Sequence, residues 1–127
     1  MTAASNVANA KKAYAAFTAG DLEAALENID PDVEWVVGGD STVSGVYRGI
    51  EEVVGWWATL LEAGFSTMPM AFFADEDRAI VITESTTGEE TSEAVDILEF
   101  RDGKLVRFRS LGDGERFERV FGVRSLR

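Results

Sequence analysis

Apolar residues recur at every third or fourth position in three stretches of the first half of the chain. This spacing predicts amphipathic helices near residues 7–20, 22–29 and 50–63. Gly20 and Gly64 are expected to end the first and the third helix, and Asp21 is placed to cap the second. The buried helix faces are predicted to carry Val7, Ala10, Tyr14, Phe17, Leu22, Ala25, Leu26, Ile29, Val53, Val54, Trp57, Leu60 and Leu61.

The rest of the chain alternates apolar and polar residues, with short polar turns between the alternating segments. Strands are predicted at 33–37, 46–47, 65–74, 78–86, 91–101 and 104–111, the last of which could resume as far as 121. Turns are predicted at 30–32, 75–77, 87–90 and 101–103. Helices first and a meander of strands afterwards indicate the α+β class, with a curved antiparallel sheet that the helices cover on one face.

The predicted turn at 87–90 sets the register of its hairpin. If Thr87 and Glu90 flank a two-residue turn, Val81 lies opposite Asp96. On the other face lie two apolar pairs, Ile80 with Ile97 and Ile82 with Val95. Both faces of the hairpin are therefore apolar. One covers the interior, and the other needs a partner, for which a second copy of the chain is the simplest.

The composition excludes several kinds of site. A chain of 127 residues is expected to form one domain, residues 1–127. It contains no cysteine and no histidine. Disulfides, thiolate zinc sites, Ser-His-Asp triads and facial-triad iron sites therefore cannot be built. Any metal would be a hard cation held by carboxylates, and we expect no cofactor.

The charge of the chain narrows the range of partners. With 23 acidic and 12 basic residues, the net charge is −11. This charge repels phosphate backbones and anionic membrane surfaces, so we expect neither a nucleic-acid nor a membrane partner. The first residues lack the apolar core of a signal peptide, and no stretch approaches the roughly 18 apolar residues of a membrane span. A cytoplasmic location is the expectation.

Four segments occur in the order typical of one superfamily. They are Ala13–Leu22 (AYAAFTAGDL), Asp32–Trp35, Val46–Gly49 and Phe100–Arg109. With them the chain resembles the SnoaL-like and ketosteroid-isomerase-like branch of the nuclear transport factor 2-like superfamily. The resemblance implies a cone-shaped sheet, of the cystatin-like roll type, packed on three N-terminal-half helices around a central pocket for a small apolar organic ligand. It also implies a homodimer through the outer face of the sheet.

Asp96 is the first candidate for a catalytic residue. It interrupts the apolar run 94–98, where burial and strand propensity both disfavour aspartate. A carboxyl that shares a face with Leu98 and Val81 is expected to have a raised pKa, which suits a general acid. The ketosteroid-isomerase-like pattern also carries an aspartate here, which stays protonated and helps to hold an oxyanion. The alternative is that Asp96 only accepts a hydrogen bond from a neighbouring group.

The other residues of the best-described relatives are missing. The resemblance places the catalytic tyrosine of the isomerases at Ala13, so Tyr14 is expected to point about 100° away from the site. It places the catalytic base at Val37. The arginine and aspartates of the limonene epoxide hydrolase pattern correspond to the segment 83–86 and to Ser110. Neither reaction is therefore transferred to this chain.

Asp113 is the second candidate. SnoaL-like cyclases often end the last strand with an aspartate after an aromatic-rich run, and Asp113 lies near that position. The sequence favours a different interpretation, in which Asp113 is an ordinary turn residue between Gly112 and Gly114.

Large side chains supply most of the predicted ligand contacts. The candidates are Tyr14, Trp35, Tyr47, Trp57, Val81, Leu98, Phe108 and Ser110. A polar atom of Trp35 or Tyr47 could orient an apolar ligand, whereas Trp56 is expected to be more exposed, at a pocket mouth or an interface. For each aromatic residue, plain core packing is the alternative.

These patterns favour a cofactor-independent enzyme of isomerase, cyclase or hydratase type, with Asp96 as acid or base. A non-catalytic small-molecule binding or dimerisation domain of the same fold is the alternative, because the sequence places only one of the two polar groups that acid–base catalysis usually needs.

Overall fold

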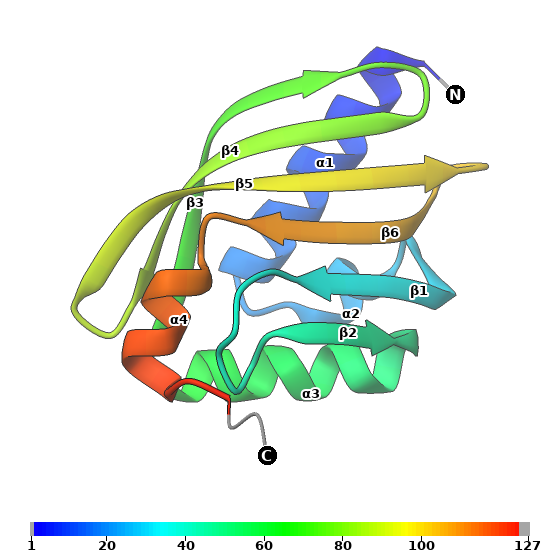
Figure 1. Cartoon of the computed structure of the whole chain (residues 1–127). Coiled ribbons are helices and arrows are strands. Elements are labelled where there is room, and N and C mark those ends of the chain that lie inside the picture. The colour runs from blue at the N-terminus through cyan, green and yellow to red at the C-terminus, as the bar shows by residue number, and fades with distance from the viewer. Residues whose placement is uncertain (1, 125–127) are drawn as a thin grey trace.

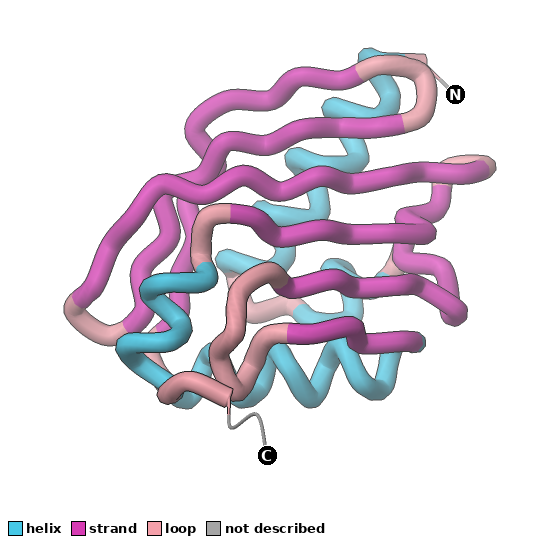
Figure 2. Tube along the Cα trace, viewed as in Figure 1, coloured by secondary structure: helices cyan, strands magenta, loops and turns pink. Residues whose placement is uncertain are grey.

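A computed structural model describes residues 2–124 and contains one six-stranded sheet with helices packed on one of its faces (Figures 1 and 2). The helices are α1 (Ala3–Thr18), α2 (Leu22–Leu26), α3 (Gly49–Glu62) and α4 (Gly114–Phe121). The strands are β1 (Ile29–Val37), β2 (Gly45–Arg48), β3 (Phe65–Ala74), β4 (Arg78–Thr87), β5 (Glu90–Arg101) and β6 (Lys104–Leu111). The α+β class and the three helices in the N-terminal half are therefore confirmed.

The strands follow the order β2-β1-β6-β5-β4-β3 across the sheet. Every neighbouring pair is antiparallel except β1 and β6, which run parallel. The expectation of a wholly antiparallel sheet is wrong for this pair. Parallel neighbours need a long connection between them, and the chain provides one because α3 and four strands lie between β1 and β6.

The β4–β5 hairpin has the predicted register. Val81 is paired with Asp96, and the pairs Ile80–Ile97 and Ile82–Val95 lie on either side of it. Burial along β5 alternates, so that Ala94, Asp96, Leu98 and Phe100 are buried and the residues between them are more exposed. This alternation directs Asp96 to the face that the helices cover.

Two local predictions are wrong. Residues 30–32 form part of β1 instead of a turn, at a place where the register between β1 and β6 shifts. Such a break in the ladder lets Pro31, which has no N–H to donate, lie inside a strand. The segment after Leu111 does not resume as a strand. Gly112 ends β6 with φ +92°, and α4 follows.

The core lies between the inner face of the sheet and the helices. Helix α3 buries Trp56 as well as Trp57, and the Trp56 indole N–H donates to the Val43 carbonyl at 3.1 Å. The prediction of an exposed Trp56 is therefore wrong, because the β1–β2 connection covers that side of α3. None of the helices within residues 2–124 has the length and apolar character of a membrane span.

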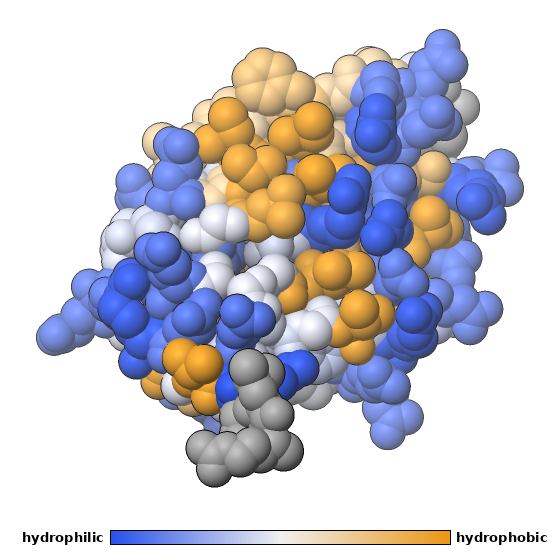
Figure 3. Space-filling model, in the orientation of Figure 1, coloured by the Kyte–Doolittle hydropathy of each residue, from blue (hydrophilic) through white to orange (hydrophobic). Residues whose placement is uncertain are grey.

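The outer face of the sheet is apolar over β3, β4, β5 and the end of β6. Figure 3, in the orientation of Figure 1, shows hydrophobic side chains gathered over these strands. We call this surface the outer patch. It comprises the exposed Met68, Met70, Phe73, Ile80 and Leu111 and the half-buried Ile82, Val95 and Ile97.

Candidate functional site

A cavity of about 80 Å³ opens between the inner face of the sheet and helices α1 and α3. Its aromatic walls are Phe17, Trp35, Trp56, Trp57, Phe65 and Phe108, and its polar lining is Tyr14, Thr67, Ser85, Asp96, Ser110 and Asp113. An apolar cavity of roughly 150 Å³ can hold benzene. The present space therefore accommodates only a small ring or part of a larger ligand, unless side chains move.

Asp96 lies in this cavity on β5 and is 7% exposed. Its Oδ2 accepts a hydrogen bond from the Tyr14 hydroxyl. The pKa of Asp96 is raised to about 7, and burial is the largest cause. The hydrogen bond from Tyr14 partly opposes this rise, and the charge of the nearby Asp113 adds to it. A carboxyl with this pKa is present in both protonation states near neutral pH and can therefore give or take a proton.

Tyr14 reaches the site, contrary to the expectation that it would point away. Both Ala13 and Tyr14 line the cavity, because the cavity extends across more than one residue's width of α1. Burial and the Asp96 charge raise the pKa of Tyr14 well above its ordinary value, so the phenol stays protonated as a donor. Val37, at the position of the isomerase base, is a buried core residue.

Asp113 is also buried in the cavity, at 4% exposure. It lies at the N-cap of α4 but does not cap that helix. Its Oδ2 accepts a hydrogen bond from Ser110 Oγ at 2.8 Å, and its Oδ1 is 2.5 Å from Arg116 Nη2. The interpretation of Asp113 as an ordinary turn residue is therefore wrong, because its carboxylate is directed inward.

Arg116 is a functional candidate that the sequence did not reveal. It is 1% exposed on α4 and donates to Thr87 Oγ1 at 3.0 Å, to Ser92 Oγ and to Asp113. These bonds join α4 to the ends of β4 and β5. The only indication in the sequence was the spacing of Asp113 and Arg116, because residues three positions apart are neighbours when they lie in a helix.

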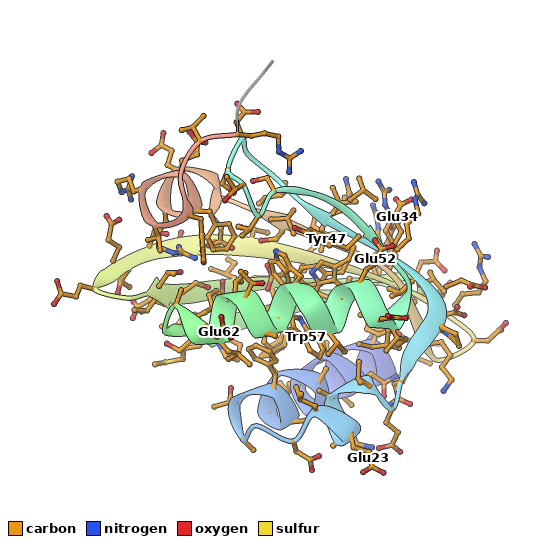
Figure 4. The ribbon with its side chains drawn as sticks, turned by 90° about the horizontal axis from the view of Figure 1, so that it is seen from below. Glu23, Glu34, Tyr47, Glu52, Trp57 and Glu62 are labelled. Carbon is orange, nitrogen blue, oxygen red and sulfur yellow. The ribbon has the colours of Figure 1, made fainter. Side chains whose placement is uncertain are left out.

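Trp35 and Phe108 form one wall. Their rings are stacked with centroids 3.9 Å apart, and Trp57 meets the Trp35 ring edge-on. Figure 4 shows Trp57 between α3 and the helices α1 and α2. Trp35 is 5% exposed, and its buried Nε1 has no hydrogen-bond partner among residues 2–124. Trp35 thus brings a buried donor without such a partner to the wall of the cavity.

Two predicted contact residues lie outside the cavity lining. The Tyr47 hydroxyl donates to the Val43 carbonyl at 2.7 Å, and the residue lies on the other side of α3 from Trp57 (Figure 4). Val81 is fully buried beside Asp96 but belongs to the core. The other predicted contacts line the cavity; these are Tyr14, Trp35, Trp57, Leu98, Phe108 and Ser110.

Thr67 and Ser85 are lining residues that the sequence interpretation passed over. Their hydroxyls lie 2.9 Å apart on β3 and β4. The signal was the alternation of Thr83, Ser85 and Thr87, which places three hydroxyls on the inner face of one strand. For metals, no group of three or more acidic, His or Cys side chains within residues 2–124 could hold an ion.

The curled sheet, the helices on one face and the aromatic-walled cavity between them fit the nuclear transport factor 2-like class. The sequence profile of the SnoaL-like domain matches residues 10–108, and the chain belongs to the SnoaL-like domain family. The expected superfamily is thereby confirmed.

A curated relative matches part of this chain. An uncharacterised protein of Mycobacterium tuberculosis is 36% identical over 58 residues, which are 46% of this chain and 44% of that protein. The match thus spans less than half the length of the curated relative.

Three solved structures are similar over most of this chain. Bal32a, from a soil-derived mobile gene cassette, has a TM-score of 0.86 and 23% identity, covering 94% of this chain and 98% of its own. TerC, co-crystallised with polyporic acid, has a TM-score of 0.79 and 26% identity over 92% and 98%. A proposed ketosteroid isomerase from Kribbella flavida has a TM-score of 0.76 and 21% identity over 87% and 79%. The first and third likenesses concern the fold alone.

Proposed function

We propose that this chain is a cofactor-independent enzyme of isomerase, cyclase or hydratase type, which moves protons on a small, largely apolar ligand. The observation that carries the proposal is the buried Asp96 carboxyl, with a pKa of about 7, in an aromatic-walled cavity that also contains Asp113. Membership in the SnoaL-like family supports it. Function on this fold depends on the site, so the residues carry the argument.

The two carboxyls would take different roles. Asp96, protonated for part of the time near neutral pH, gives a proton to an oxygen of the ligand. Tyr14 then stabilises the Asp96 carboxylate through its hydroxyl. Asp113, whose charge is matched by Arg116, accepts a proton from the ligand or from a bound water. Environments that separate the behaviour of two neighbouring acids are typical of acid–base sites.

The ligand would be oriented by Trp35. Its indole N–H has no partner within residues 2–124, and a buried donor without an acceptor costs about 1–3 kcal/mol. A carbonyl or ether oxygen on the ligand meets this need. TerC, crystallised with polyporic acid, supports a small organic occupant for a pocket of this fold.

A non-catalytic binding domain is the second candidate. It is favoured by the fact that both carboxylate oxygens of Asp113 already accept hydrogen bonds, one from Ser110 and one from Arg116, so that fewer lone pairs are left for a ligand. In this case Asp96 would only hold the ligand, and proton exchange on the ligand would not be accelerated.

Proton exchange on cyclopentanone in D₂O separates the two candidates. We expect the wild-type protein to accelerate exchange of the protons next to the carbonyl, and Asp96→Asn to lower this rate by about 10²-fold, the scale of a positioned acid or base. The exchange is followed by proton NMR. Asp102→Asn, in the exposed β5–β6 turn, is the control and should leave the rate unchanged. Wild-type protein that gives no exchange would favour the binding domain.

The net charge bears on nucleic-acid and membrane partners, and the outer patch bears on a protein partner. The absence of nucleic-acid and membrane partners and the cytoplasmic location stay predictions based on the net charge of −11. We propose that a second copy of the chain covers the outer patch, because an apolar surface that spans four neighbouring strands is costly to leave in water. An isologous contact of about 800 Å² per copy would suffice for a stable dimer.

Ile80→Lys tests the dimer. Ile80 is 40% exposed and is paired with Phe73 and Ile97 of the outer patch, and a lysine there would place a charge in the apolar contact between the two copies. We expect the wild-type protein to sediment as a dimer and the variant as a monomer in analytical ultracentrifugation. Leu61→Lys, on the exposed side of α3 at 45% exposure, should leave the dimer intact. A monomeric wild-type protein at all concentrations would contradict the proposal.

A further inference from the structure

Three hydroxyls form a chain along the inner face of β3 and β4. Thr67 Oγ1 lies 2.9 Å from Ser85 Oγ, which lies 3.2 Å from Thr83 Oγ1. Thr83 Oγ1 lies 3.4 Å from the Ala94 carbonyl oxygen. Thr83 and Ser85 are buried, and Thr67 and Ser85 line the cavity.

All three contacts can be hydrogen bonds at the same time in only one direction. A carbonyl oxygen can only accept, so Thr83 gives its one hydroxyl proton to Ala94. Ser85 must then donate to Thr83, and Thr67 must donate to Ser85. Each hydroxyl has a single proton, and all three protons are now committed. Toward the cavity, Thr67 and Ser85 therefore present oxygen lone pairs and no donor.

The other cavity hydroxyls are committed in the same way. The Tyr14 hydroxyl donates to Asp96, and the Ser110 hydroxyl donates to Asp113. The hydroxyls of the lining thus offer acceptors only, whereas Trp35, another lining residue, has an indole N–H without a partner among residues 2–124. A ligand oxygen that faces Thr67 and Ser85 would meet lone pairs without a proton between them.

We propose that Thr67 and Ser85 form a subsite that selects a ligand carrying an O–H or N–H donor. The inference rests on the proposed function, since it takes the cavity as the small-molecule site. The ligand class is a small ring compound with a donor directed at the hydroxyl wall and an acceptor oxygen toward Asp96 or Trp35. The aromatic walls favour a ring, and the volume of about 80 Å³ limits its size.

Pyrrole and furan form a matched pair of probes. The two five-membered aromatic rings have nearly the same size, but pyrrole carries an N–H donor and furan an oxygen acceptor. We expect wild-type protein to bind pyrrole about tenfold more tightly than furan, which corresponds to about one hydrogen bond. Binding is measured by titration of the protein's amide and indole signals in proton–nitrogen NMR spectra.

Ser85→Ala makes the sharpest variant. Removing the Ser85 hydroxyl takes away the acceptor of the Thr67 hydroxyl proton, so that Thr67 becomes a donor toward the cavity. The preference for pyrrole should fall about tenfold, to near equality with furan. Thr67→Val, which keeps the shape of the side chain, should weaken pyrrole binding several-fold and leave furan binding unchanged. Thr86→Val is the control, because Thr86 and Thr91 form an equivalent 2.9 Å hydroxyl pair outside the cavity.

Each outcome decides the proposal. Equal affinities for pyrrole and furan in the wild-type protein, an unchanged preference in folded Ser85→Ala, or no binding of pyrrole would each overturn it. The proposed acid–base function is judged separately, by exchange on cyclopentanone, which has no O–H or N–H donor. Exchange without a pyrrole preference would reject the subsite alone, and a pyrrole preference without exchange would reject the catalysis alone.

Discussion

Between about pH 4 and pH 7, ionisation linked to Asp96 is expected to lower the free energy of unfolding of the wild-type protein by about 4 kcal/mol. The native state holds the Asp96 proton up to a pKa of about 7, compared with an ordinary value of 3.8. Within this window the unfolded chain has released the proton and the native state has not. The unfolded state therefore binds fewer protons, and stability falls as the pH rises and then levels off.

Asp96→Asn isolates this effect. The amide does not titrate, and its oxygen can still accept the Tyr14 hydroxyl, so the variant is expected to lack the fall and to be more stable than wild type at pH 8. Urea denaturation of both proteins at a series of pH values gives the difference, in which the contributions of all other carboxyls cancel. A difference that does not change with pH would show that Asp96 ionises as easily as a surface carboxyl.

Tyr14→Phe is a control variant for which the direction of the change in the Asp96 pKa is expected in advance. The Tyr14 hydrogen bond lowers the pKa of Asp96, and removing it should raise that pKa further. The fall in stability should then extend to higher pH. This response would separate the specific Tyr14–Asp96 contact from burial in general, because phenylalanine keeps the carboxyl buried.

An aspartate that reduces stability at neutral pH has no structural advantage over asparagine at the same position. A carboxyl that can give and take a proton at this position is what the proposed acid–base function requires. A second buried carboxylate, Asp113, lines the same cavity and adds to the cost by raising the pKa of Asp96.

The strands from β3 to β6 could be predicted because their signals are local. Alternation and polar turns specify β4 as Arg78–Thr87 and β5 as Glu90–Arg101 to within one residue, and the two-residue turn then fixes Asp96 opposite Val81. Asp96 could be recognised for the same reason, since a charged residue in an apolar strand contradicts the strand's own pattern.

The partners of Asp96 could not be predicted because they depend on how separate elements meet. Tyr14 and Asp96 lie 82 positions apart, and only the placement of α1 against the sheet brings the hydroxyl to the carboxyl. The position inferred from the resemblance, Ala13, lies one residue away. An alignment error of one residue cannot be detected from the sequence here, because Ala13 and Tyr14 both line the cavity.

The Asp113–Arg116 pair could not be predicted, because the segment after β6 was expected to be a turn or a strand and is a helix. In an extended chain Asp113 and Arg116 would point to opposite faces, whereas in α4 they form a buried ion pair. Gly112 and Gly114 gave the segment the composition of a turn, and α4, from Gly114 to Phe121, is short. Its position depends on tertiary contacts more than on local propensity.

Arg116→Met is expected to lower the free energy of unfolding by about 3–5 kcal/mol, because it leaves the Asp113 carboxylate buried without its cation. Methionine retains much of the apolar stem, so the loss of packing is small. The control is Arg119→Met on the same helix, where Arg119 Nε lies 2.7 Å from Glu90 in an exposed pair worth about 0–1 kcal/mol. Adding Asp113→Asn to Arg116→Met removes the unpaired charge and should restore part of the stability. Urea denaturation at pH 7 measures all four proteins. If Arg116→Met costs no more than Arg119→Met, the buried pair does not hold α4 and Asp113 in place.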